Sequence, residues 1–91
     1  MQTPHLDVRF ASSAQTKPRV GLIVPKHKHT AIDRNRLRRR LRELIRIQLL
    51  PAFVRGEALI RAKAEAYDVS FAGLREEIGS IGNWISGLEQ R

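Results

Sequence analysis

The sequence predicts a small α+β domain whose elements follow one another in the order strand, strand, helix, strand, helix. Two short apolar segments before residue 25 have the length and spacing of strands, and a third lies at residues 57–63. Two longer segments repeat their apolar residues at helical spacing. With 91 residues, the chain has the length of one domain, which we assign to residues 1–91, and of one modest hydrophobic core.

Residues 5–11 and 19–24 are the first two expected strands. In the first, Leu6, Val8 and Phe10 alternate with polar residues, which is the period of a half-buried strand. The second is a nearly continuous apolar run that ends before a proline. The polar residues 12–18 between them favour a turn, so we expect the two strands to pair as a hairpin.

The first helix is expected to begin at Thr30 and to run to about Leu50, where Pro51 stops it. Thr30 and Asp33 have the spacing of a capping box, in which a hydroxyl and a carboxylate bond free backbone N–H groups of the first turn. At 3.6 residues per turn, one apolar stripe runs along this helix and arginines occupy most other positions. The stripe comprises Leu37, Leu41, Leu44, Ile45 and Gln48.

Residues 57–63 form the third expected strand, and Ser70 is a suitable N-cap for the last helix. After Ser70, apolar residues recur every three or four positions, as on one face of a helix. They are Phe71, Leu74, Ile78, Ile81, Ile85 and Leu88. Each glycine weakens a helix by roughly 1 kcal/mol relative to alanine, so we expect this helix to fray or break near Gly79–Gly82.

Positive charge is concentrated in the first half of the chain. The formal net charge is +8, and residues 1–50 hold 12 of the 17 Lys and Arg but only three of the nine Asp and Glu. Seven arginines lie within residues 34–46. Because a guanidinium group donates hydrogen bonds in a planar fork that matches phosphate oxygens, this helix is typical of nucleic-acid binding. The few aromatic residues favour phosphate and shape recognition of structured RNA or DNA over base stacking.

The sequence lacks the common signatures of a protein active site. It has no cysteine, no glycine-rich phosphate loop and no His-Glu-x-x-His zinc motif. The spacing of His27 and His29 would allow both to bind a metal, but Lys26 and Lys28 disfavour a cation there. A phosphate-contacting basic loop or plain exposure to solvent is favoured over a metal site. We therefore expect no catalytic residue, no metal site and no cofactor on the protein.

The sequence also indicates where the protein works. No apolar run approaches the roughly 18 residues that would span a membrane, and the first residues lack the pattern of a signal peptide. Without cysteine there is no disulfide framework of the kind found in small secreted proteins. These observations predict a cytoplasmic protein without membrane association.

The arginine-rich helix and its surroundings resemble one known family. The run RNRLRRRLRE at residues 34–43 resembles the RNR motif of the bacterial ribonuclease P protein component, and RVGLIVPK at residues 19–26 is similar to the strand that precedes it in that family. Residues 57–63 resemble the family's next strand, and residues 70–74 its last helix. Order and spacing agree over residues 19–78.

The resemblance implies an α/β sandwich with a left-handed β-α-β crossover, and here without the helix that precedes the first strand in the family. It implies a protein subunit of ribonuclease P that binds the catalytic RNA and assists removal of the 5′ leader from precursor tRNA. Hydrolysis then belongs to the RNA and to Mg²⁺ bound by it, and we expect the protein to be a monomer. The residues expected to contact RNA are Lys26, Lys28, Arg34, Asn35, Arg36, Arg38, Arg39, Arg40, Arg42, Arg46 and Lys63.

Two other functions remain open at this point. A general RNA- or DNA-binding module of ribosomal-protein type would use the same helix without a processing role. It would differ from a ribonuclease P subunit in needing no particular RNA partner. A metal-dependent nuclease in its own right would need acidic ligands clustered in space, which the sequence gives no reason to expect.

Overall fold

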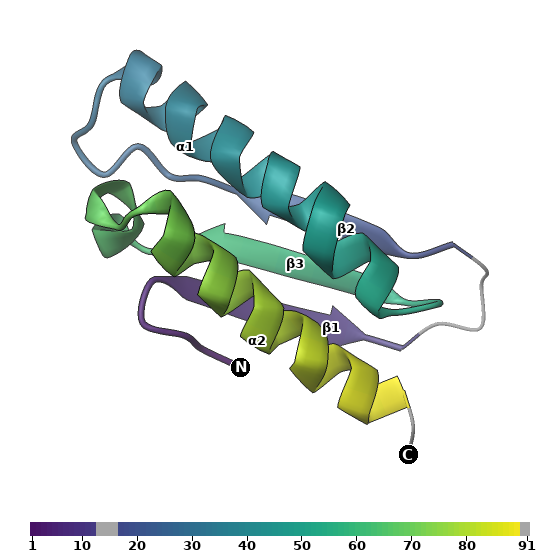
Figure 1. The fold of residues 1–91 in the computed structure, drawn as a ribbon. Coiled ribbons are helices and arrows are strands. Elements are labelled where there is room, and N and C mark those ends of the chain that lie inside the picture. The colour runs from purple at the N-terminus through teal and green to yellow at the C-terminus, as the bar shows by residue number, and fades with distance from the viewer. Residues whose placement is uncertain (13–16, 90–91) are drawn as a thin grey trace.

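The computed structural model describes residues 1–12 and 17–89 of the chain. In that part, three strands and two long helices follow one another in the predicted order (Figure 1). They are β1 (Leu6–Ala11), β2 (Arg19–Ile23), α1 (Ala31–Leu44), β3 (Glu57–Ala62) and α2 (Phe71–Glu89). The described residues also form three shorter helical segments: a π-helical turn η1 (Ile45–Leu49) and two 3-10 turns, η2 (Leu50–Ala52) and η3 (Ala64–Asp68).

The strands form one mixed sheet in the order β1-β3-β2. β3 lies in the centre, antiparallel to β1 and parallel to β2. The predicted hairpin between β1 and β2 is therefore wrong, because the two strands lie on opposite edges of β3. The physical reason is the connection, whose seven residues, 12–18, exceed the two to five of a typical hairpin loop and allow the chain to pass β3. The turn expected within it lies partly outside the described residues.

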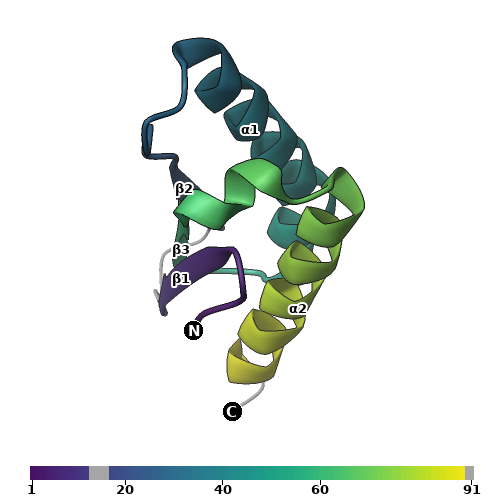
Figure 2. The same cartoon turned by 90° about the vertical axis from the view of Figure 1, so that its left-hand side faces the viewer.

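The crossover from β2 through α1 to β3 is left-handed, as the family resemblance implies. In Figure 1, β2 and β3 both run from right to left, β3 lies below β2, and α1 returns in front of the sheet. Figure 2 confirms that both long helices lie on one side of the sheet. Most parallel crossovers are right-handed, so this connection is an uncommon feature of the fold.

The first helix begins as predicted. Thr30 is its N-cap, and the Thr30 hydroxyl accepts a hydrogen bond from the Asp33 N–H at 3.1 Å. The Asp33 carboxylate, which a capping box would direct at the Thr30 N–H, lies instead 3.6 Å from Nδ1 of His29. Helical structure continues past Leu44 through η1 and η2, so Pro51 lies inside a short 3-10 turn. A proline is tolerated there because the first turn of a helix leaves N–H groups unbonded in any case.

The last helix is continuous, and the predicted break near Gly79–Gly82 is wrong. Ser70 does cap it, since its hydroxyl accepts a hydrogen bond from the Gly73 N–H at 3.0 Å. Packing explains why the glycines do not interrupt α2. A Cβ added at Gly82 would lie 3.2 Å from Cβ of Ala52, so the missing side chain lets α2 approach the end of the first helix closely. The lost helix propensity is offset by tertiary contact.

The hydrophobic core lies between the inner face of the sheet and the two helices. Alternate strand residues, among them Leu6, Val8 and Ile60, point to this face and are buried. The predicted stripe of α1 and most of the predicted seam of α2 meet them there. Buried residues of these helices are Leu37, Leu41, Leu44, Ile45, Leu74, Ile78, Ile81 and Ile85. Phe71 departs from the prediction, since it begins α2 at the end of the seam and remains 40% exposed.

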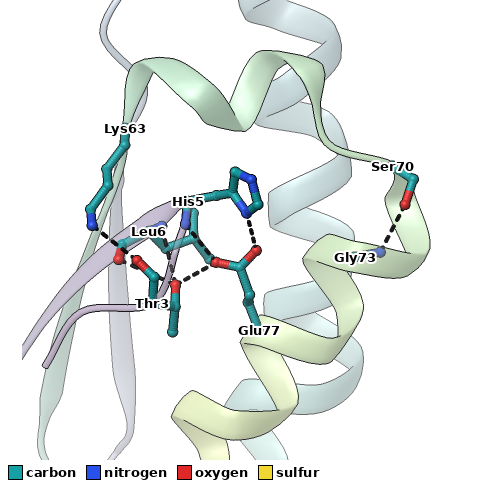
Figure 3. A network of polar contacts seen from close by, with 7 residues as sticks. All are labelled: Thr3, His5, Leu6, Lys63, Ser70, Gly73 and Glu77. Carbon is teal, nitrogen blue, oxygen red and sulfur yellow. Dashed lines mark hydrogen bonds and ion pairs between the residues drawn. The ribbon is translucent and has the colours of Figure 1, made fainter.

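A polar network ties the N-terminal segment to the middle of α2 (Figure 3). Glu77 accepts hydrogen bonds from the Thr3 hydroxyl at 2.5 Å and from the His5 N–H at 2.8 Å, and its second oxygen lies 2.5 Å from Nδ1 of His5. Burial disfavours the Glu77 carboxylate, but these hydrogen bonds outweigh it and hold the pKa of Glu77 below its ordinary value. The segment before β1 is thereby fixed against the helical layer.

Candidate nucleic-acid interface

The arginines of α1 lie on two flanks, one on each side of its buried stripe. Helical spacing separates Arg38 and Arg42 on one flank from Arg36 and Arg40 on the other. A shallow hollow of about 420 Å³ lies along the first flank, and we call it the arginine groove. Its lining residues are Asn35, Arg38, Arg39, Arg42, Glu43 and Arg46. The structure thus brings together five of the residues predicted to contact RNA.

Glu43 is the acidic residue of the arginine groove, and it is paired. Oε1 of Glu43 lies 2.6 Å from Nη2 of Arg46, one turn further along the helix. The hydrogen bond from Arg46 lowers the pKa of Glu43, which therefore stays ionised and does not resemble a general base. The other four residues of the groove carry three guanidinium groups and one amide. The groove is chemically suited to phosphate oxygens.

Arg34 has a structural bond that the sequence did not reveal. Its Nε donates to the backbone oxygen of Val24 at 2.6 Å, and its side chain is half-buried. The bond joins the end of β2 to the first turn of α1 and closes the loop between them. The guanidinium of Arg34, a predicted RNA contact, is therefore partly committed to the fold.

Lys26 and Lys28 lie in that loop, before α1, and both are exposed. The loop is tightly curved, with positive φ angles of 47° at His27 and 69° at Lys28. Two hydrogen bonds hold its shape: the His29 N–H donates to the Lys26 oxygen at 2.8 Å, and the Tyr67 hydroxyl donates to the Pro25 oxygen at 2.5 Å. The two lysines extend the positive surface beyond the start of α1.

Lys63 lies apart from the other predicted contacts. It follows β3, where its Nζ donates to the backbone oxygen of Thr3 at 2.9 Å (Figure 3). The same Nζ lies 3.4 Å from Oε1 of Gln2. Its ammonium group thus holds the N-terminal segment beside β1. The structure does not bring Lys63 into the arginine groove.

The outer face of the sheet is a feature that sequence reasoning missed. Strand pairing places Arg9, Leu59 and Gly21 in one row across the sheet, with Asp7, Arg61 and Ile23 in the next row. A groove of about 520 Å³ runs along this face. Leu59 and Ile23 are each 41% exposed there, and a Cβ at Gly21 would lie 3.0 Å from Leu59. The alternation of β3, with Ala58, Ile60 and Ala62 on the inner face, is the signal that predicts this outer row.

Phe10 lies mainly with the core, in keeping with its place in the alternating strand. Its ring packs edge-on against Phe53, with centroids 5.7 Å apart and an interplanar angle of 87°. It also reaches one end of the outer-face groove. Trp84 is half-buried against the core rather than an exposed stacking platform.

The histidines of the loop do not form a metal site in the structure. Among residues 1–12 and 17–89, no group of three or more His, Cys, Asp or Glu side chains could hold a metal ion. His29 stacks on Tyr67 instead, with ring centroids 3.8 Å apart.

No helix in the described ranges is both long and apolar enough to cross a membrane.

Comparison with known proteins identifies relatives of this chain. The family model described as Ribonuclease P matches residues 1–83. The ribonuclease P protein component of Mycobacterium ulcerans is 38% identical over 68 residues, which cover 75% of this chain and 57% of the relative. That of Syntrophobacter fumaroxidans is 32% identical over 83 residues, which cover 89% of this chain and 69% of the relative. The chain thus spans little more than half the length of the mycobacterial relative.

Solved structures share the fold. The RNase P protein from Thermotoga maritima superposes with a TM-score of 0.76 at 22% identity, over 89% of this chain and 77% of that one. The RNase P protein of Staphylococcus aureus gives a TM-score of 0.76 at 19% identity and the same coverage. The predicted α+β fold is confirmed by these superpositions. Together with the family model, which spans most of the sequence, the relatives show that the chain belongs to the ribonuclease P protein family.

Proposed function

We propose that this chain acts as the protein subunit of ribonuclease P and assists removal of the 5′ leader from precursor tRNA. Membership of the family supports this function, and the arginine groove is the observation that carries it. Arg39 and Arg42 are exposed there, and its carboxylate, Glu43, is already paired with Arg46. Such a surface offsets the repulsion between phosphates of a folded RNA.

In this proposal the catalytic RNA carries out hydrolysis with Mg²⁺ bound to the RNA, and the protein supplies charge and shape. The acids of the arginine helix support such a division of labour. Asp33 lies 3.6 Å from a histidine nitrogen, and Glu43 is ion-paired at 2.6 Å, so neither is placed as a general base. The protein would hold no cofactor of its own and would work in the cytoplasm as a monomer on the RNA.

The outer face of the sheet is the surface we assign to the single-stranded leader. In the family that this chain resembles, the leader lies in a cleft between the sheet and the helix that precedes the first strand. Here Arg9 and Arg61 flank the exposed Leu59 on that face. Residues of all three strands line the groove beside them. Guanidinium groups beside apolar side chains suit a flexible strand, whose phosphates and bases both need partners.

Reconstitution with a bacterial ribonuclease P RNA tests the proposal. Cleavage of precursor tRNA is measured at low Mg²⁺, where repulsion between phosphates is least screened. We expect added protein to raise the cleavage rate strongly. The double variant Arg39→Ala/Arg42→Ala should raise it much less, whereas Arg75→Ala, an exposed arginine on α2, should behave as the parent. Equal stimulation by an unrelated basic protein would favour the general RNA-binding module.

A further inference from the structure

A second hollow lies on the opposite flank of α1 from the arginine groove. It has a volume of about 200 Å³ and lies where α1 faces η3. We call it the η3 pocket. Its polar lining residues are His29, Asp33, Arg36, Arg40, Tyr67 and Asp68. Arg36 and Arg40 were predicted RNA contacts, but the structure separates them from the other arginines and gives them neighbours from a segment some 30 residues downstream.

One wall of the η3 pocket is preorganised. The His29 and Tyr67 rings stack almost parallel, with centroids 3.8 Å apart and an interplanar angle of 3°. The Tyr67 hydroxyl donates to Pro25, and Nδ1 of His29 lies 3.6 Å from Asp33. Burial raises the pKa of Tyr67; the charge of Arg34 opposes this shift and that of Asp33 adds to it. The Tyr67 hydroxyl therefore remains a donor. This wall holds its shape without a ligand.

The other groups of the η3 pocket are available to a ligand. Within the part of the chain that the structure describes, the side chains of Arg36, Arg40 and Asp68 make no hydrogen bond or ion pair. Arg36 and Arg40 are one turn apart on α1, so both guanidinium groups reach the same side of the pocket. Asp33 and Asp68 place carboxylates beside them. The pocket thus offers unpaired donors and acceptors within one small volume.

This combination selects against simple ions. Two carboxylates repel a free phosphate, and two guanidinium groups repel a cation. A neutral ligand that presents adjacent donors and adjacent acceptors satisfies both sets of groups. Among RNA bases, guanine presents N1–H and N2–H₂ side by side for a carboxylate, and O6 and N7 side by side for a guanidinium. Cytosine offers a carboxylate only its single amino group, and adenine likewise.

We propose that the η3 pocket binds the guanine base of an unpaired RNA nucleotide. Asp68 or Asp33 would accept from the N1–H and N2–H₂ edge, and Arg40 or Arg36 would donate to O6 and N7. Unpaired bases are the usual targets of sequence-specific RNA recognition, because their edges are accessible. The inference rests on the proposed function in one respect, since the nucleotide would belong to the RNA bound on the neighbouring arginine groove.

Mononucleotide titration of the whole protein, followed by amide chemical shifts in NMR, tests the pocket. The probes are 5′-GMP, 5′-AMP, 5′-CMP and 5′-UMP, with guanosine to separate base from phosphate. We expect GMP and guanosine to shift the amides of Tyr67, Asp68 and Arg40, and GMP to bind about tenfold or more tightly than the other nucleotides. Equal shifts from all four nucleotides, or shifts confined to the arginine groove, would overturn the proposal.

Variants locate the contact and separate it from the proposed function. Asp68→Asn and Arg40→Gln change exposed side chains, so the folded spectrum should persist while GMP affinity falls about tenfold. Arg75→Gln, at an exposed arginine of α2 outside both hollows, is the matched control and should leave GMP affinity unchanged. An equal loss of GMP affinity in Arg75→Gln would contradict the pocket. If GMP binds as expected but the protein does not stimulate ribonuclease P RNA, the proposed function fails and the pocket stands; the reverse result rejects only the pocket.

Discussion

The side chain of Glu77 on α2 lies 2.5 Å from the ring of His5, although 72 positions separate the two residues in the sequence. The same carboxylate accepts hydrogen bonds from the His5 N–H and the Thr3 hydroxyl. Glu77 is 9% exposed, and a buried carboxylate is tolerated only where hydrogen bonds replace its water. This carboxylate therefore connects the start of the chain to the helical layer.

The network makes stability depend on pH in a defined direction. Because the pKa of Glu77 is lowered in the folded protein from an ordinary value of 4.5, its contribution is complete above about pH 4.5 and is lost as pH falls through the folded value. Glu77→Gln should lower the free energy of unfolding at pH 7 by roughly 1.5–3 kcal/mol and reduce its fall in acid. Denaturant titrations from pH 3 to pH 7 measure both effects. Glu76→Gln, its exposed neighbour, should change neither, and equal effects of the two variants would contradict the role of the network.

Substitution by alanine should have different effects on stability at two glycines of α2. A Cβ at Gly87 meets nothing within 4 Å, so Gly87→Ala should raise stability by up to about 1 kcal/mol through helix propensity. At Gly82 the Cβ would lie 3.2 Å from Ala52, so Gly82→Ala should lose most or all of that gain. Thermal unfolding of the two variants compares them directly. A larger gain at Gly82 would show that close packing does not explain the unbroken helix.

The elements could be predicted from the sequence because their signals are local. Alternation in residues 5–11, the cap at Thr30 and the seam of α2 each depend on neighbours a few positions away. The pairing of β1 with β3 could not be predicted in this way. Alternation states which residues share a face, but it does not state which strand lies alongside. The unbroken α2 likewise depends on Ala52, which lies 30 positions before Gly82.

In the candidate site, too, local patterns predict some features, and others depend on contacts between distant residues. Helical spacing predicts that Arg39 and Arg42 point away from the core, and they do. It cannot predict that Arg34 bonds Val24, because the carbonyl that accepts this bond lies ten positions earlier, where β2 ends. Nor does any periodic pattern bring Tyr67 and Asp68 to α1. Those neighbours come from a short 3-10 turn that the hydrophobic pattern does not mark.

The outer face of the sheet predicts a leader-dependent effect. Leu59 is 41% exposed in the centre of that face, so Leu59→Ala should cost little stability. In the reconstituted particle it should weaken binding of precursor tRNA that carries a leader and leave binding of mature tRNA unchanged. Affinities for both RNAs measure this. The control is Ile47→Ala, because Ile47 is also an exposed apolar residue but lies on η1, away from the sheet. An equal loss for both RNAs would place the leader elsewhere.

The arginine groove predicts a loss of RNA affinity without a loss of fold. Arg39, Arg42 and Arg46 are exposed, and alanine is the best helix former, so the triple alanine variant should keep its helical circular dichroism and melt within a few degrees of the parent. Each lost phosphate contact should reduce the slope of log affinity against log salt by about one. Titrations of structured RNA at several salt concentrations give that slope for the parent and the variant.

Leu41→Ala on the same helix supplies the opposite case. Leu41 is fully buried beneath the arginines, so its truncation should cost roughly 2–5 kcal/mol of stability through the cavity it leaves. Under conditions where this variant remains folded, its salt slope should equal that of the parent, because the guanidinium groups are unchanged. If instead the triple arginine variant unfolds, or binds RNA with the parent's slope, then α1 does not divide its core and its RNA contacts between opposite faces, and the proposed function loses its main physical support.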